Sequence, residues 1–349
     1  MRNMSFETII ENFKVKTLPE SEAELTGDVP AEAVAEYHDQ ALALIAGSIK
    51  LDGFREGKVP PALALQKIGE MAVLEEAVEL LVHDLYPELV LGKKLDVVGR
   101  PDIRITKLTA GAPVSLTIRT AVYPIVEVPK DWKKIAQKVP AETPADVTDE
   151  EVAQTLESLR KHRKMTDEAT GAETLPELDD AFAKSIGSFD TLDALKDAVK
   201  KGAIEEKARE AKDKRRGAII DALVEKTKID LPRLFVESEL EKIMGQLRDD
   251  VTRIGMNFED YLKHSQKTQE EVRESFREQA KKRAVLQLLL NELASQEKIE
   301  VDEADVEEEM KHALEHFPDA NTEALRIHIQ TVLRNNKVLE LLENVERSS

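Results

Sequence analysis

Side chains placed for metal or acid–base chemistry are few in this sequence of 349 residues. Among seven histidines, only His312 and His316 have the i,i+4 spacing that places two imidazoles on one face of a helix. A zinc peptidase of the His-Glu-x-x-His type needs glutamate directly after the first histidine, and Ala313 occupies that position. We therefore interpret both residues as surface histidines and expect no metal site.

The carboxylates and hydroxyls also lack the arrangement of a catalytic site. Acidic runs such as Glu150-Glu151 and Glu307–Glu309 stand where helices are expected to begin, and negative charge there interacts favourably with the helix dipole. The chain has no Ser-His-Asp order of a hydrolase, no glycine-rich dinucleotide loop and no Walker sequence. We expect no catalytic residue, no cofactor and no ATP hydrolysis.

One turn, residues 53–60, combines an unusual backbone with an apolar ring and cations. It reads Gly-Phe-Arg-Glu-Gly-Lys-Val-Pro, in which the glycines permit backbone angles closed to other residues and the proline biases Val59 away from helix. A phosphate loop is excluded, because the glycine spacing is one residue short and Val59 replaces the Ser or Thr that binds Mg²⁺. Phe54, Arg55 and Lys58 fit a contact point for a partner. The alternative is an ordinary turn with Phe54 in the core.

The pattern Gly-Phe-Arg-x-Gly-x-x-Pro between two expected helices resembles the ribosome-docking signature of trigger factor, a bacterial family of nascent-chain chaperones. The resemblance implies two partners: the ribosome, through a protein at the exit tunnel and nearby rRNA, and unfolded nascent polypeptides. It also implies a weak homodimer and no membrane contact. The residues that it assigns to ribosome binding are Gly53, Phe54, Arg55, Glu56, Gly57, Lys58 and Pro60.

Glu56 departs from the family pattern, which usually has a basic residue at this position. A carboxylate beside Arg55 neutralises part of its charge and repels an acidic partner, so we expect weaker docking than for a family member with lysine there. The rival interpretation is a ribosome-independent holdase or assembly scaffold that has lost tight docking. A periplasmic chaperone of related architecture is disfavoured, because residues 1–13 lack a basic head followed by an apolar core.

Composition indicates a helix-rich cytoplasmic protein. Charged residues make up 34% of the chain and aromatic residues 4%, which suits long solvated helices. No run approaches the roughly 20 apolar residues that a membrane span needs, and the absence of cysteine agrees with a reducing compartment. A net charge of −19 excludes broad nucleic-acid binding, so any ribosome contact is expected to be local.

Residues 1–128 are expected to form an α+β ribosome-binding domain, a small antiparallel sheet with a helical hairpin. Alternating apolar and polar residues predict two strands between Phe6 and Val29 and further strands around residues 103–122. Apolar residues at helical spacing predict helices over Ala31–Lys50 and about Pro61–His83, with Leu44 on the apolar face of the first. The turn then lies at the tip of the hairpin.

Residues 129–178 are expected to form a linker and the first arm helix. Three prolines mark the boundary, and Trp132 is expected to fix the linker on a neighbouring domain. Thr148–Glu151 reads as a capping box that starts a helix ending near Lys164. Most of the trigger factor family has a prolyl isomerase domain of the FK506-binding type after this helix. Here only Thr166–Glu177 intervene, which is too short for such a domain, so we expect no isomerase activity.

Residues 179–349 are expected to form an elongated all-α chaperone domain with helical arms that cradle substrate. Asp190 or Thr191 is predicted to cap a helix that continues to about Lys226, and Thr268–Glu271 is a second capping box. The apolar spacing is no sustained heptad, which favours a cradle over a coiled-coil rod. The resulting hypothesis is an ATP-independent chaperone that docks at the exit tunnel and shields nascent polypeptides by weak apolar contacts.

Overall fold

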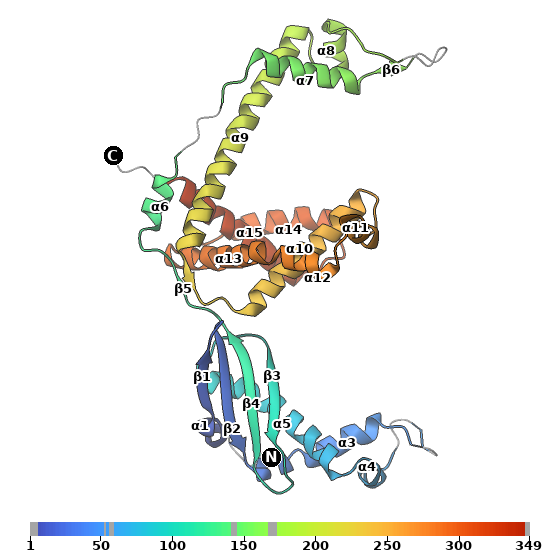
Figure 1. The fold of residues 1–349 in the computed structure, drawn as a ribbon, viewed down its shortest axis with the longest axis vertical. Coiled ribbons are helices and arrows are strands. Elements are labelled where there is room, and N and C mark those ends of the chain that lie inside the picture. The colour runs from blue at the N-terminus through green and yellow to red at the C-terminus, as the bar shows by residue number, and fades with distance from the viewer. Residues whose placement is uncertain (1–5, 52–53, 56–58, 141–144, 167–172, 346–349) are drawn as a thin grey trace. The chain divides into compact units, whose positions relative to one another are not determined.

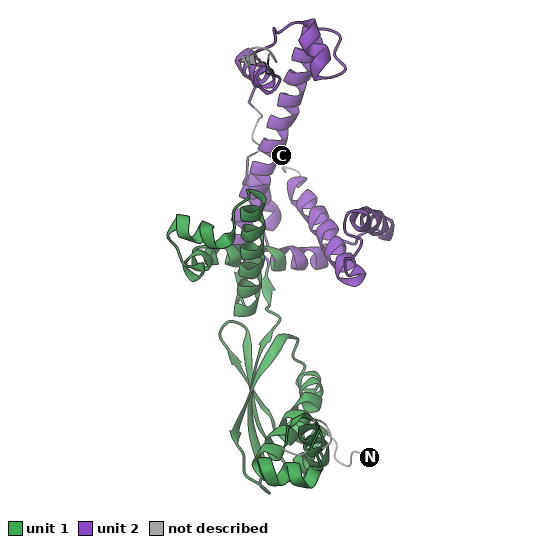
Figure 2. Ribbon diagram, turned by 90° about the vertical axis from the view of Figure 1, so that its right-hand side faces the viewer, with its two compact units in different colours: residues 1–127, 228–288 green, residues 128–227, 289–349 purple. Residues whose placement is uncertain are grey.

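The computed structural model describes residues 6–51, 54–55, 59–140, 145–166 and 173–345, and the chain divides into two compact units (Figure 2). One unit comprises residues 1–127 and 228–288, and the other comprises residues 128–227 and 289–349. The expected class, an α+β N-terminal part followed by helices, is confirmed. The domain boundaries expected after residues 128 and 178 stay a prediction.

The first unit contains a four-stranded antiparallel sheet (Figure 1). Its strands are β1 (Lys14–Leu18), β2 (Glu22–Val29), β3 (Val97–Lys107) and β4 (Val114–Val122), in the order β1-β2-β4-β3. Leu25 on β2 pairs with Ile118 on β4, and both side chains are fully buried. Gly27, two residues further along β2, leaves room for the ring of Phe13, because a Cβ atom there would lie 2.6 Å from the ring. Alternation along β2 thus turns one face of the sheet into core.

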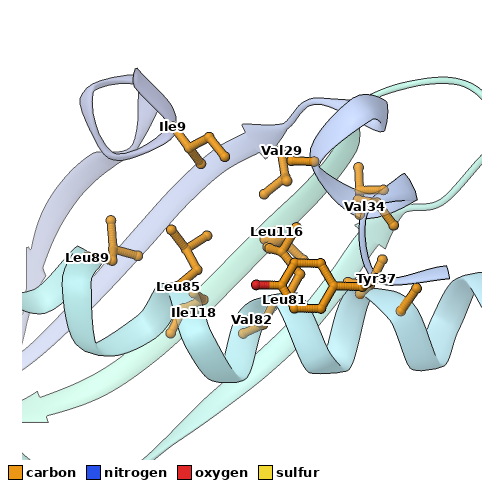
Figure 3. Close-up of a cluster of buried hydrophobic side chains, with 14 of the residues drawn as sticks. Ile9, Val29, Val34, Tyr37, Leu81, Val82, Leu85, Leu89, Leu116 and Ile118 are labelled. Carbon is orange, nitrogen blue, oxygen red and sulfur yellow. The ribbon is translucent and has the colours of Figure 1, made fainter. Parts of the chain in front are cut away.

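Helices supply the other side of this core. They are α1 (Phe6–Asn12), α2 (Ala31–Ala35), α3 (His38–Ser48), α4 (Pro61–Ile68) and α5 (Glu70–Gly92). On α5, Leu81, Leu85 and Leu89 recur at i,i+4 and face the sheet residues Leu116 and Ile118 (Figure 3). The 3.6-residue period of α5 therefore matches the two-residue period of the strands across one apolar layer.

The structure corrects three sequence predictions in this unit. The first residues of the stretch predicted as two strands form the helix α1. The helix predicted over Ala31–Lys50 is divided at Glu36–Tyr37, where the Tyr37 hydroxyl donates to Asp84 on α5 at 2.9 Å. The next predicted helix is divided at Gly69, whose φ of +86° favours glycine, and its second part continues to Gly92.

The remaining part of the first unit begins where β5 (Val126–Glu127) pairs with β8 (Lys228–Ile229). Three helices follow, α10 (Arg233–Arg253), α11 (Phe258–Ser265) and α12 (Gln269–Ser275), and then α13 (Arg277–Gln296), which continues into the second unit. Val236, Leu240 and Ile243 on α10 pack with Ala280 on α13. The Thr268–Glu271 capping box is confirmed.

Two polar contacts fix these helices. The guanidinium groups of Arg273 and Arg277 bind Glu237 at 2.5 and 2.9 Å and hold the pKa of that carboxyl below its usual value. In the β1–β2 turn, the backbone N–H groups of Glu20 and Ser21 donate to the Asp230 carboxylate at 3.0 and 2.7 Å. The segment that starts α10 is therefore hydrogen-bonded to the sheet.

The second unit is built from helices. Its helices are α6 (Trp132–Lys138), α7 (Asp149–His162), α8 (Asp180–Ile186), α9 (Leu192–Lys226), α14 (Glu303–His316) and α15 (Thr322–Glu343), with a short hairpin of β6 (Met165–Thr166) and β7 (Glu173–Thr174). The predicted linker thus includes a helix, and its Trp132 is only 6% exposed. The capping box at Thr148 and the cap at Thr191 are confirmed.

The 35-residue helix α9 is continuous through both of its glycines, Gly202 and Gly217. Its C-terminal half binds α15, where Arg216 pairs with Glu343 and Lys212 reaches the same carboxylate at 3.2 Å.

Among the described residues, no helix is long and apolar enough to cross a membrane.

Candidate functional site

The candidate site is the loop between α3 and α4, residues 49–60, which we call the docking loop. Helix α3 ends at Ser48, and Pro60 begins the next helix in an extended conformation, with ψ 135° and Pro61 in the first helical position. The two prolines set where α4 starts, because neither can donate a backbone hydrogen bond. The described part of the docking loop is residues 49–51, 54–55 and 59–60.

The structure places Phe54 at the surface. Its side chain is 41% exposed, and its backbone N–H donates to the carbonyl of Leu51 at 3.0 Å, which closes a tight turn. The alternative in which Phe54 lies in the core is therefore wrong. Arg55 is also exposed, and no carboxylate of the described residues pairs with it. Phe54 and Arg55 are adjacent in sequence, and the side chains of both are exposed to solvent.

Four of the residues assigned to ribosome binding, Gly53, Glu56, Gly57 and Lys58, lie outside the described residues. Pro60 is exposed at the start of α4. The docking role of all seven residues stays a prediction, and the described geometry supplies the positions of Phe54, Arg55 and Pro60.

Both ends of the docking loop pack against a small apolar cluster. Val59 is 5% exposed and packs with Ala46 of α3 and Ala64 of α4. Leu51, at the other end, is half-buried against the same cluster. The pattern of the sequence indicates the backbone restriction at Val59, and an apolar residue directly before the two prolines is also a signal for burial. The packing of Leu51 and Val59 holds both flanks of the loop against α3 and α4.

The hairpin that carries the loop is locally basic. From Ala41 to Ile68 the charged residues are Lys50, Arg55, Lys58 and Lys67 against Asp52 and Glu56, so four positive and two negative charges leave +2 in a chain of net charge −19. Two leucines extend the apolar surface, because Leu44 is 50% and Leu63 is 41% exposed. The periodicity predicts Leu44 on the apolar face of its helix, but in the structure Leu44 is not part of the core cluster between the helices and the sheet.

Other sequence candidates show no catalytic arrangement. The rings of His312 and His316 lie edge to face at 5.0 Å between centroids and are exposed. Across the described ranges, no group of three or more His, Cys, Asp or Glu side chains is placed to hold a metal ion.

Several helices expose large apolar side chains, which the sequence could not assign. Phe317 at the end of α14 is 67% exposed, and Ile327 and Val332 on α15 are 59% and 41% exposed. In the other unit, Ile254 at the end of α10 is 73% exposed. Exposed apolar side chains are therefore present on helices of both units.

Comparison with known families identifies two matching sequence profiles. Residues 11–159 match the profile described as bacterial trigger factor protein, and residues 191–347 match the profile of the bacterial trigger factor protein C-terminus. The stretch between the two matches is residues 160–190.

Full-length relatives agree with the profiles. The chain is 25% identical to the trigger factor of Agathobacter rectalis, with 85% of this chain and 86% of the relative covered. It is 26% identical to the trigger factor of Streptomyces coelicolor, covering 85% and 80%, and 24% identical to that of Halalkalibacterium halodurans, covering 87% and 90%.

A solved structure shows a similar fold. It belongs to a study described as promiscuous substrate recognition in folding and assembly activities of the trigger factor chaperone. The match has a TM-score of 0.56 at 20% identity and covers 95% of this chain and all of the other.

Proposed function

The chain belongs to the bacterial trigger factor family of chaperones, and on that premise we propose that it is an ATP-independent chaperone that docks beside the ribosomal exit tunnel and shields nascent polypeptides. Docking uses the loop at residues 49–60. Its partners are a protein at the exit tunnel and the emerging chain, which places the activity in the cytoplasm. A weak homodimer remains a prediction from the family.

The observation that supports docking most directly is the exposure of Phe54 and Arg55 on a loop whose two ends pack against an apolar cluster. An aromatic ring that is pre-positioned by its neighbours loses little conformational entropy on binding and buries a large apolar area. The guanidinium can pair with two oxygens of a carboxylate or phosphate at the same time. Phe54 therefore supplies most of the apolar contact and Arg55 the orientation.

The charge of the chain limits the affinity. With −19 overall, the remainder of the surface is repelled by phosphate and by acidic protein, and only the locally basic hairpin is attracted. Docking is therefore modest in affinity and weakens as salt screens the few attractive charges. Reversible docking suits a chaperone that leaves with its substrate.

Substrate shielding uses the separate apolar areas of the helical arms, including Phe317, Ile327 and Ile254. Each area buries little surface when it meets an unfolded chain, so each contact is weak, and many contacts together hold the chain. Because every contact dissociates quickly, release needs no ATP. The chain carries no isomerase activity in this proposal, since α7 and α8 are separated by residues 163–179.

Co-sedimentation with ribosomes tests the docking site. We expect the double variant Phe54→Ala/Arg55→Ala to bind at least tenfold more weakly than the wild type, because truncation of central aromatic and arginine contacts costs about 2 kcal/mol or more. The binding curve is measured by pelleting ribosomes at several chain concentrations and two salt concentrations.

The control is Leu91→Ala/Arg100→Ala, which removes an exposed apolar side chain and an exposed arginine of the same unit away from the loop. It should pellet like the wild type. Equal pelleting of the wild type and the Phe54→Ala/Arg55→Ala variant would contradict the assignment of ribosome docking to this loop. It would favour a ribosome-independent holdase or scaffold.

A further inference from the structure

We propose that the segment Arg160–Lys164, which we call the basic segment, forms with the cleft beside it a binding site for single-stranded RNA. It reads Arg-Lys-His-Arg-Lys and carries four formal positive charges and a histidine in a chain of net charge −19. It lies in the second unit, at the end of α7, and it contains none of the residues assigned to docking.

The helix accounts for only part of this charge. Cations in the last turn of a helix interact favourably with its dipole, which explains Arg160 and Lys161. Arg160 is in addition held in place, since its Nε donates to the carbonyl of Pro176 at 2.7 Å and its guanidinium binds Glu157 at 3.2 Å. Arg163 and Lys164 come after the helix has ended.

Two cations of the basic segment, Lys161 and Arg163, are exposed, and no carboxylate of the described residues pairs with either of them. By contrast, Lys207 on α9 binds Glu151 at 2.8 Å, and Arg216 on the same helix pairs with Glu343. In a chain with 69 acidic and 50 basic residues, unpaired neighbouring cations are available to an external anion.

The cleft beside the basic segment has a lining of mixed charge. Its volume is about 740 Å³, and its lining includes the basic residues His162, Arg163 and Lys164. The carboxylates Glu177 and Asp179 line the same cleft. The Asp179 side chain accepts the backbone N–H of Phe182 at 2.8 Å through one oxygen, Oδ1.

The combination of basic residues and carboxylates in one cleft favours some polyanions over others. The basic residues attract phosphate groups, and the carboxylates of the same cleft can only accept hydrogen bonds. Ribose hydroxyls are donors that satisfy such acceptors, whereas the side chains of an acidic peptide offer further acceptors and are repelled. DNA lacks the 2′-hydroxyl, so it loses the same hydrogen bonds. The site therefore fits single-stranded RNA better than acidic protein or DNA.

The inference depends on the proposed function in one respect: the ribosome is the source of the RNA. Its test uses isolated RNA and the full chain, so that failure of RNA binding and failure of the docking loop give different results. Ribosome pelleting of Phe54→Ala/Arg55→Ala reports on the docking loop, and binding of isolated RNA by Lys161→Gln/Arg163→Gln reports on the basic segment.

Fluorescence anisotropy measures the binding of a labelled, unstructured RNA of about 20 nucleotides over a salt series. We expect the variant Lys161→Gln/Arg163→Gln to bind at least tenfold more weakly than the wild type at low salt. The slope of log affinity against log salt should fall by about 1.4, because each lost phosphate contact on a single strand removes about 0.7. Circular dichroism verifies that the variant is folded.

The matched control is Lys267→Gln/Arg283→Gln, which removes one exposed lysine and one exposed arginine from residues 228–288 of the first unit. It should keep the wild-type affinity and slope. An equal loss in the control, or no RNA binding by the wild type at low salt, overturns the proposal. Competition by polyglutamate as strong as by RNA, or equal affinity for DNA of the same sequence, reassigns the segment to acidic protein or to any phosphate chain and also overturns it.

Discussion

At the scale of single residues, Phe54 and Val59 have opposite environments within the same loop. Val59 is buried between α3 and α4, whereas Phe54 is exposed to solvent. The prolines that follow Val59 restrict its backbone to extended conformations, and burial of its side chain then fixes that end of the loop. Hydrophobicity alone would place both residues inside, so the exposed ring is the informative one.

The charge of the neighbouring residue, Glu56, is predicted to limit docking. Glu56→Lys should strengthen ribosome binding, because it replaces a repulsive charge beside Arg55 by an attractive one. At a contact distance near 4 Å in water each charge pair contributes about 1 kcal/mol, so we expect a gain of roughly fivefold to thirtyfold in affinity at low salt. Ribosome co-sedimentation at low and high salt measures the gain and its screening.

The control is Glu88→Lys, which makes the same charge change at an exposed position on α5. A gain from Glu88→Lys as large as that from Glu56→Lys would mean that overall charge, rather than the loop, limits docking.

At the scale of secondary-structure elements, α9 and α15 are joined by a nearly buried carboxylate. Glu343 is 9% exposed, Arg216 and Lys212 bind its side chain, and Arg215 donates to its backbone carbonyl at 2.9 Å. Burial by itself raises the pKa of the Glu343 carboxyl, but the hydrogen bonds from Arg216 and Lys212 outweigh it and hold the pKa below the usual value. The ionised form is thus the one that stabilises the fold.

The variant Glu343→Gln should therefore lower stability at neutral pH, by about 1 to 3 kcal/mol, since hydrogen bonds to charged groups are lost. A carboxyl whose folded pKa is depressed contributes stability above its unfolded pKa, near 4.5, and that contribution is lost as pH falls through the folded pKa. The difference in urea midpoint between wild type and variant should be full at pH 7 and shrink below pH 4.5.

Glu340→Gln, on the same helix and exposed, is the control and should change the free energy of unfolding by less than about 0.5 kcal/mol. A difference between wild type and Glu343→Gln that stays constant down to pH 3 would contradict the role of the ionised carboxylate.

At the scale of the whole molecule, each compact unit is assembled from two stretches that are distant in sequence. Residues 228–288 belong with residues 1–127, and residues 289–349 belong with residues 128–227. The antiparallel pair β5–β8 and the hydrogen bonds from Ser21 to Asp230 close the first unit, and the contacts of α9 with α15 close the second. Removal of the C-terminal stretch would therefore expose the apolar face of α9, not only delete an arm.

Two activities of the full chain can be tested together, holding of unfolded protein and prolyl isomerisation. The short connection between α7 and α8 predicts that the second is missing. We expect the full chain to suppress aggregation of an unfolded substrate protein without ATP and to leave the rate of its proline-limited refolding unchanged. Refolding is followed by fluorescence at catalytic chain concentrations, and light scattering reports aggregation at equimolar concentrations.

A prolyl isomerase added to the same refolding reaction is the positive control. Strong acceleration of the proline-limited phase by the chain alone would refute the absence of isomerase activity. Failure to reduce light scattering at any chain concentration would refute the holding activity.

Local features of the fold were determined by the sequence alone, because they depend on residues within about one helical turn of each other. The capping boxes at Thr148 and Thr268 are cases of this kind, and so is the helical hairpin around residues 49–60. The docking signature was readable for the same reason, since its glycines, ring, cations and proline are contiguous.

Tertiary structure decided which apolar side chains are covered and which cations are paired. Leu44 fits the apolar periodicity of its helix and is exposed, and Val59 lies in a loop and is buried. Both outcomes depend on elements distant in sequence. Likewise the sequence shows five consecutive basic residues at 160–164, but only the fold shows that Arg160 is held by Pro176 and Glu157. Periodicity describes one element, whereas burial and ion pairing are properties of the elements around it.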